Sequence, residues 1–324
     1  MIRETLRQLL DANLRLPPEY REQLTNHLPM ALQALHALGA GDERLHGFYA
    51  DYAQRFAGRE AAPDAAPVAD WRALRGAVNG FAALRATFAR ALAQGGRDAV
   101  LREALPDLLA GVAAAAFHGL IRTAHAIEAE HDDELAAALA YWAWRWQPLS
   151  PAPAGARLVF DDWAAELTSQ AAEWTCEGLS ISIRMSTAAA SVPYRALAGR
   201  LAAAHDLLPR LADFAARRYA QTGNFTVLHL VTGLRAFRVI SPWLDDAGAA
   251  TPLLVQAVTA AYLAARIDPR AALPASPALA WPTVIAAAIA SDDDHVIKLV
   301  HACREEHAAY GSAASLDAAR RAVA

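Results

Sequence analysis

The chain has 324 residues, 55% of them hydrophobic and 20% charged, which is typical of a soluble globular protein with a large core. The net charge of −4 at pH 7 and the lack of basic runs with interleaved aromatic residues exclude a polycationic surface for nucleic acid. The two cysteines, Cys176 and Cys303, are isolated, which favours reduced thiols over a disulfide framework.

The N-terminal segment and one long uncharged stretch indicate whether the protein is secreted or inserted in a membrane. The N-terminus lacks the apolar centre and small-residue cleavage site of a signal peptide, so we expect a cytoplasmic enzyme without membrane contact. Residues 271–291 are uncharged over about the length of a bilayer-spanning helix. Prolines interrupt this stretch and alanine, which adds little insertion energy, dominates it. We therefore expect a buried turn and a core helix there.

Apolar residues recur at helical spacing almost throughout, and strong helix formers dominate the composition. The pattern predicts an all-α fold. Only "LSISIRM", residues 179–185, alternates like a strand, and it predicts a short edge strand or an extended loop. In chain order, the expected helices are Ile2–Ala12, Pro18–Leu38, Glu43–Phe56, Trp71–Leu92, Leu105–Ala129, Asp133–Trp146, Phe160–Cys176, Tyr194–Ala220, Thr226–Val239, Pro252–Ile267 and Asp292–Tyr310.

Three segments rich in proline and alanine, residues 58–70, 147–155 and 274–282, predict breaks between helices. The second is a candidate domain boundary. Candidate ligands occur on both sides of it, however. We therefore expect one multi-helix domain over residues 1–324, with a long connection near 147–159 and a buried metal site between helices.

Histidines in apolar helices are the main chemical signal, because nucleotide loops, nucleophile elbows, paired-cysteine sites and HExxH helices are absent from the sequence. A single histidine in such a helix is more often a hydrogen-bonded core residue than a metal ligand. His125 and His301 are intermediate candidates, since each shares a helix face with a stronger one. The strongest candidates are His27 in "LTNHLPMAL", His118 in "AAAAFHGLIRTAHAI", His229 in "NFTVLHLVTGLRAFR" and His295 in "SDDDHVIKLV".

Lys298 is the only lysine in the chain, and it lies among aliphatic residues three positions after His295. A leftover surface lysine in a gene that uses few lysine codons is the plain alternative. Burial would instead lower the pKa of the amine and make its neutral form available. Such an amine can act as a base, form a Schiff base, or take up carbon dioxide to give a carbamate. The preceding aspartates, residues 292–294, are expected to cap the helix, with a hydrogen bond to a histidine as the lesser alternative.

Five segments, "NHLPMAL", "FHGLIRTAHAIE", "ELAAALAYWA", "LHLVTGLRAFR" and "SDDDHVIKLV", resemble the questin oxidase-like family in content and order. This family includes fungal enzymes that open anthraquinone rings or perform Baeyer–Villiger-type oxygenations in polyketide pathways. Arg235 is a departure, because many relatives carry a histidine after the "VTG" element. The resemblance implies an all-helical non-haem iron oxygenase whose Fe2+ ligands are His27, His118, His229, His295 (with His301 as its alternative) and a carboxylated Lys298.

The resemblance further implies an aromatic or quinone-like polyketide substrate that reacts with dioxygen, by ring cleavage or oxygen insertion. It leaves open whether NADPH serves as reductant and which oligomeric state the protein adopts. Arg122 is expected to hold a substrate oxyanion or a carboxylate such as Glu134, or to form an ordinary interhelical salt bridge. Phe225 and Trp281 are weaker candidates for a pocket wall. Two other classes remain as alternatives: a metallohydrolase that uses the same ligands with zinc, and a non-catalytic helical protein that binds an apolar ligand.

Overall fold

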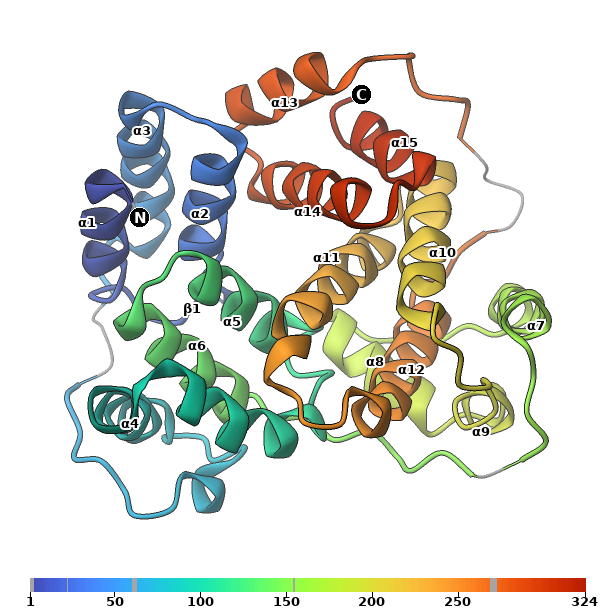
Figure 1. Ribbon diagram of the computed structural model, residues 1–324, viewed down its shortest axis with the longest axis horizontal. Coiled ribbons are helices and arrows are strands. Elements are labelled where there is room, and N and C mark those ends of the chain that lie inside the picture. Colours follow the sequence, from blue (N-terminus) through green and yellow to red (C-terminus); the bar gives the residue numbers. More distant parts are fainter. Residues whose placement is uncertain (1–2, 22, 60–62, 154, 269–272) are drawn as a thin grey trace.

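Helices make up nearly all of the regular structure in the computed structural model, which describes residues 3–21, 23–59, 63–153, 155–268 and 273–324 (Figure 1). The all-α prediction is confirmed. Short 3-10 turns at Gln54–Phe56, Trp71–Leu74 and Ser241–Trp243 and a small antiparallel pair, β1 (Glu19–Tyr20) and β2 (Leu24–Thr25), complete the elements of these residues. The α-helices are α1 (Glu4–Asn13), α2 (Leu28–Leu38), α3 (Asp42–Ala53), α4 (Phe81–Leu109), α5 (His118–Glu128), α6 (Asp132–Trp144), α7 (Phe160–Glu173), α8 (Ile181–Ala189), α9 (Val192–Leu197), α10 (Leu207–Thr222), α11 (Phe225–Ile240), α12 (Ala247–Ala264), α13 (Trp281–Ala290), α14 (Asp294–Tyr310) and α15 (Ala313–Ala322).

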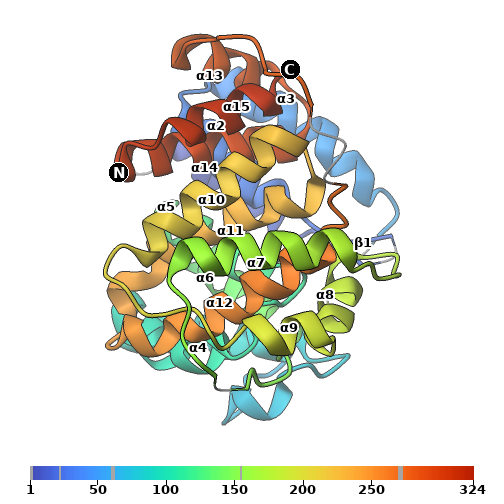
Figure 2. The ribbon, with the colours of Figure 1, turned by 90° about the vertical axis from the view of Figure 1, so that its right-hand side faces the viewer.

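Four helices, α2, α5, α11 and α14, form the centre of the molecule. Helices α2 and α11 each pack against both α5 and α14, so the four close a ring (Figure 1). Helix α5 is buried from His118 to Ile127, because α6 covers its outer side. Outer helices enclose the others: α15 packs on α10 and α14, and α7 crosses the outer side of α12 (Figure 2). Buried apolar side chains from Leu6 to Ala319 belong to one continuous core.

Side-chain caps mark the start of two of the central helices, α11 and α14. The Asn224 side chain accepts hydrogen bonds from the backbone N–H groups of Thr226 and Val227 and so caps α11. Asp293 caps α14 in the same way by accepting from the N–H of His295. Phe117, with a left-handed φ of 68°, stands immediately before α5. The two caps thereby place His229 and His295 near the starts of their helices.

Some expected helices are shorter or divided. The segment Pro18–Leu38 is helical only from Leu28, because the β1–β2 pair occupies its first half. The segment Leu105–Ala129 is broken between α4 and α5, where residues 115–117 all have positive φ. Residues 198–206 separate α9 from α10, so the expected helix Tyr194–Ala220 is also two helices. The region Trp71–Leu92 begins as a 3-10 turn, and its α-helix starts at Phe81.

Two further expectations are wrong. The segment 179–185 is not a strand, because the Ser180 side chain accepts from the N–H of Ile183 and caps α8. Within 271–291, residues 271 and 272 lie outside the described part, and α13 lies at the surface with only Val284 and Ala288 buried. Across the described residues, no helix combines the length and apolar composition needed to cross a membrane.

Candidate metal centre

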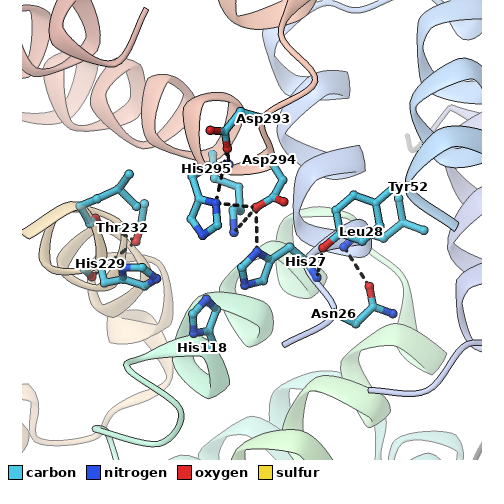
Figure 3. A network of polar contacts seen from close by, with 12 residues as sticks. Asn26, His27, Leu28, Tyr52, His118, His229, Thr232, Asp293, Asp294 and His295 are labelled. Atoms are coloured by element: carbon cyan, nitrogen blue, oxygen red, sulfur yellow. Dashed lines mark hydrogen bonds and ion pairs between the residues drawn. The ribbon is translucent and has the colours of Figure 1, made fainter. Parts of the chain in front are cut away.

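Four imidazole rings meet where the central helices begin (Figure 3). His27 immediately precedes α2, His118 opens α5, His229 lies in the first turns of α11 and His295 is the second residue of α14. The ring centroids are 4.6 Å apart for His27 and His118, 4.9 Å for His118 and His229, 5.8 Å for His229 and His295, and 4.7 Å for His295 and His27. The four histidines selected from the sequence therefore form one closed cluster.

In each of these imidazoles the Nδ1 atom faces an oxygen. Nδ1 of His118 lies 2.5 Å from the carbonyl oxygen of Ala115, and Nδ1 of His229 lies 2.8 Å from that of Phe225. A carbonyl oxygen only accepts, so both Nδ1 atoms carry the proton and both Nε2 atoms keep a lone pair. Nε2 of His118 is buried and has no hydrogen-bond partner among the residues that the structure describes. That unpartnered lone pair is what a metal ion would use.

Asp294 holds the other two imidazoles. Its Oδ1 atom lies 2.7 Å from Nδ1 of His27 and 3.1 Å from Nδ1 of His295 (Figure 3). Burial alone would raise the pKa of Asp294, but the charge interactions with His27 and Lys298 hold this pKa well below its usual value. The carboxylate is therefore ionised; it accepts the Nδ1 proton of His27 and lies in close contact with Nδ1 of His295. A carboxylate that binds the Nδ1–H of a histidine is the usual means of orienting a metal-binding imidazole.

The three consecutive aspartates have three different roles. Asp292 forms a surface ion pair with Arg44, and Asp293 caps α14. Asp294 is only 3% exposed and points into the histidine cluster, so the alternative of a histidine hydrogen bond is the correct one for this residue. Asp294 and Lys298 are four residues apart and so share one face of α14.

Lys298 is buried beside Asp294, with 3.3 Å between Nζ and Oδ1. Burial lowers the pKa of this amine, although Asp294 opposes the shift. Burial also lowers the pKa of His27 to about 3, with Lys298 as the next cause. The pKa values of His118 and His229 lie well below their usual range, mainly through burial. The buried imidazoles are thus neutral at pH 7, the form in which histidine binds a metal.

This donor set suits a divalent transition metal. His27 and His295 lie close enough together to share an ion, with Asp294 against their Nδ1 atoms. Imidazole nitrogens together with an anionic oxygen match the preference of iron and zinc. The residues present therefore fit a metal ion at this cluster.

The remaining candidates lie outside the cluster. His301 pairs with His125, with ring centroids 5.4 Å apart, so His295 and not His301 accompanies the other three imidazoles. Arg122 donates from Nε and from its NH2 group to the two carboxylate oxygens of Glu134, at 2.6 and 3.0 Å. Both partners are buried, and the pair is an interhelical salt bridge. A role of Arg122 toward a substrate stays a prediction.

The cluster approaches solvent on one side. The His295 side chain is 20% exposed, and the ring of Phe225, itself 52% exposed, lies 4.7 Å from that of His295 and 4.9 Å from that of His229. On the opposite side, the hydroxyl of Tyr52 accepts from the backbone N–H of His27, a contact that the sequence did not suggest. A cavity of about 320 Å³ between α9 and α12 includes none of these residues. His295 and Phe225 are thus the exposed side chains next to which a ligand could contact the cluster.

A helical protein with an imidazole-rich cluster at the start of its central helices defines a class of candidate metalloenzymes. The sequence model described as questin oxidase-like matches residues 24–192, more than half of the chain, and the protein belongs to this family. The resemblance noted in the sequence is thus confirmed. Membership indicates an oxidoreductase of the oxygenase type. No curated protein matches the chain.

Proposed function

We propose that the protein is a non-haem iron oxygenase that cleaves, or inserts oxygen into, an aromatic or quinone-like polyketide. The observation that supports this most is the common orientation of the four imidazoles, each with Nδ1 facing an oxygen. The family supports the oxygenase part of the proposal. Bound Fe2+ would supply the activation of dioxygen that organic side chains lack.

We further propose that Lys298 carries a carbamate when the metal is bound. Its neutral amine attacks carbon dioxide, an N–C bond forms, and one proton leaves to solvent. Lys298 as an ammonium ion and Asp294 as a carboxylate sum to zero charge. A carbamate, Asp294 and a divalent ion also sum to zero. The buried site thus avoids an uncompensated charge in both states, which supports coupled uptake of carbon dioxide and metal.

The protein residues have separate tasks in this proposal. His27, His118, His229 and His295 hold the ion, and Asp294 keeps two of these rings in place. The surrounding burial excludes water and so protects reactive species from side reactions. The half-exposed ring of Phe225 offers a flat apolar surface against which an aromatic substrate can stack.

The test combines metal content with oxygen consumption. Metal-free protein is reconstituted with Fe2+ and bicarbonate under anaerobic conditions. The number of iron ions per chain is then measured by mass spectrometry. A hydroxyanthraquinone is then added under air, with and without NADPH. We expect one iron at this cluster, loss of that iron in His118→Ala, and retention in His46→Ala, whose histidine is exposed.

Products formed under labelled dioxygen separate the classes of enzyme. Label in the product supports the oxygenase, and a dependence on NADPH identifies a two-electron reductant. Hydrolysis by the zinc-loaded chain without oxygen uptake would identify the metallohydrolase. A stable chain that takes up no metal under any of these conditions would refute the proposal and leave a ligand-binding protein.

A further inference from the structure

The four central helices carry a second group of buried polar side chains, further along each helix than the histidine cluster. Six residues of helix correspond to roughly 9 Å, so the second group lies well apart from the first. The burial of Gln33, His125, Arg235 and His301 is nearly complete. The corresponding pairs are His27 and Gln33 on α2, His118 and His125 on α5, His229 and Arg235 on α11, and His295 and His301 on α14.

Two side chains of this second group, His125 and His301, have the arrangement of a metal site together with Glu128 of α5. His125, Glu128 and His301 each present one ligand atom, and these atoms lie within 4.8 Å of one another. Nδ1 of His125 lies 2.5 Å from Oε1 of Gln33. Since that amide oxygen accepts the Nδ1 proton, the Nε2 atom of His125 keeps its lone pair. Gln33 thus orients His125 as an outer partner orients a metal-binding histidine.

Two potential ligand atoms of this site form no hydrogen bond within the described residues. Nδ1 of His301 and Oε2 of Glu128 are buried and lack a hydrogen-bond partner within the described part of the chain. An unpaired buried polar atom costs about 1–3 kcal/mol, so native proteins seldom keep two side by side without a ligand. Burial, followed by the charge of Arg235, holds the pKa values of His125 and His301 well below their usual range. Both imidazoles are therefore neutral.

We infer that His125, Glu128 and His301 form a second metal site, which takes a divalent transition-metal ion. Two imidazoles and one carboxylate are a common donor set of zinc and non-haem iron, with open positions for water. Arg235 donates to Oε1 of Glu128, which leaves Oε2 free for the ion. This inference does not depend on the function proposed above, because it concerns different ligands.

Arg235 also determines the strength of this site. Its guanidinium group is 1% exposed and its positive charge acts on both His125 and His301. A fixed cation close to the ligands opposes the binding of a second cation. The second site therefore binds its ion more weakly than the histidine cluster does, and a chelator removes that ion first.

The test counts zinc ions in the full chain. Metal-free protein is loaded with Zn2+, desalted and analysed by mass spectrometry, and a chelator is then added stepwise. We expect two zinc ions per wild-type chain, one in His301→Gln, and one in His118→Ala, which removes the other cluster. His36→Gln is the matched control and keeps both ions, because His36 also has a buried, unpartnered Nδ1 but lies outside the group.

Circular dichroism establishes that each variant is folded. If His301→Gln does not fold, Glu128→Gln replaces it, since this side chain is 24% exposed and its amide oxygen can still accept from Arg235. A wild-type chain that binds no zinc, or whose zinc content is the same in folded His301→Gln, overturns the inference. So does a folded variant of His301 or Glu128 that still binds two. The zinc content of His118→Ala reports on the histidine cluster, and that of His301→Gln or Glu128→Gln reports on the second site. The two proposals can therefore fail separately.

Discussion

The Asp294→Asn variant tests whether the carboxylate of Asp294 orients the imidazoles of the histidine cluster. The carboxylate accepts from Nδ1 of His27 at 2.7 Å and lies 3.1 Å from Nδ1 of His295. A charge-assisted hydrogen bond is about twice as strong as a neutral one, so the His27 imidazole loses about 1 kcal/mol of orientation when the acceptor becomes an amide. Together with the weaker contact to His295, the loss is about 1–2 kcal/mol, which corresponds to a roughly 5- to 30-fold weaker metal affinity.

The neighbouring aspartates provide matched controls for this measurement. Competition with a chromophoric chelator gives the dissociation constant of Zn2+ or Fe2+ for each variant, with circular dichroism as the check of folding. Asp292→Asn should leave the affinity unchanged, because Asp292 is 79% exposed and, among the residues that the structure describes, forms its ion pair with Arg44 at the surface. Asp293→Asn should weaken the affinity less than Asp294→Asn, because asparagine caps helices as well as aspartate does and Asp293 contacts only Nδ1 of His295 in the cluster, at 3.4 Å. Equal affinities for Asp294→Asn and Asp292→Asn would refute the orienting role.

Three other predictions use the same preparations. Lys298→Arg should fold yet bind almost no metal at the histidine cluster, because a permanent guanidinium charge cannot become a carbamate; full metal occupancy of that cluster would contradict this. The metal-free protein should lose stability as pH falls from about 6.5 toward 3, since the pKa of His27 is about 3 in the folded chain and the unfolded chain takes up the proton first. Urea unfolding at pH 6.5 and 5 should differ by about 2 kcal/mol from this group alone, and equal midpoints would refute the assignment. Gly119→Ala should lower the melting temperature, because its Cβ would lie 2.8 Å from Cα of Trp142, and overpacking of this kind costs about 1–3 kcal/mol. Gly47→Ala, with no atom within 4 Å of the added Cβ, is its control and should not lower it.

The sequence predicted most of the helices because their apolar spacing is regular, but it missed breaks that carry no residue signature. Residues 115–117 are two alanines and a phenylalanine with positive φ, a backbone conformation that those residue types rarely adopt. Tertiary packing, not local propensity, imposes that turn. It matters for function, since it ends with His118 at the first position of α5. The break between α4 and α5 therefore depends on the packing of the central helices and could not be predicted from the local sequence.

The site could be predicted in part for a similar reason. The four histidines stand out because each lies in an apolar segment, and the family resemblance linked them. Asp294 does not stand out, because Asp292 and Asp293 precede it and local sequence cannot tell which of three identical side chains points inward. The answer depends on how α14 is rotated against α2, which is a property of the packed structure.

The proposed carbamate offers a charge-based reason for the single lysine of the chain. Beside Asp294, an arginine would form an equally good ion pair in the metal-free protein. Adding a divalent ion would then leave two uncompensated positive charges in a buried volume. A lysine can instead lose its proton and, under the proposed carbamate chemistry, become an anion. Of the two cationic side chains that this protein uses, only lysine permits both charge states, so the proposed carbamate would account for a lysine at position 298, where every other Lys/Arg position carries arginine.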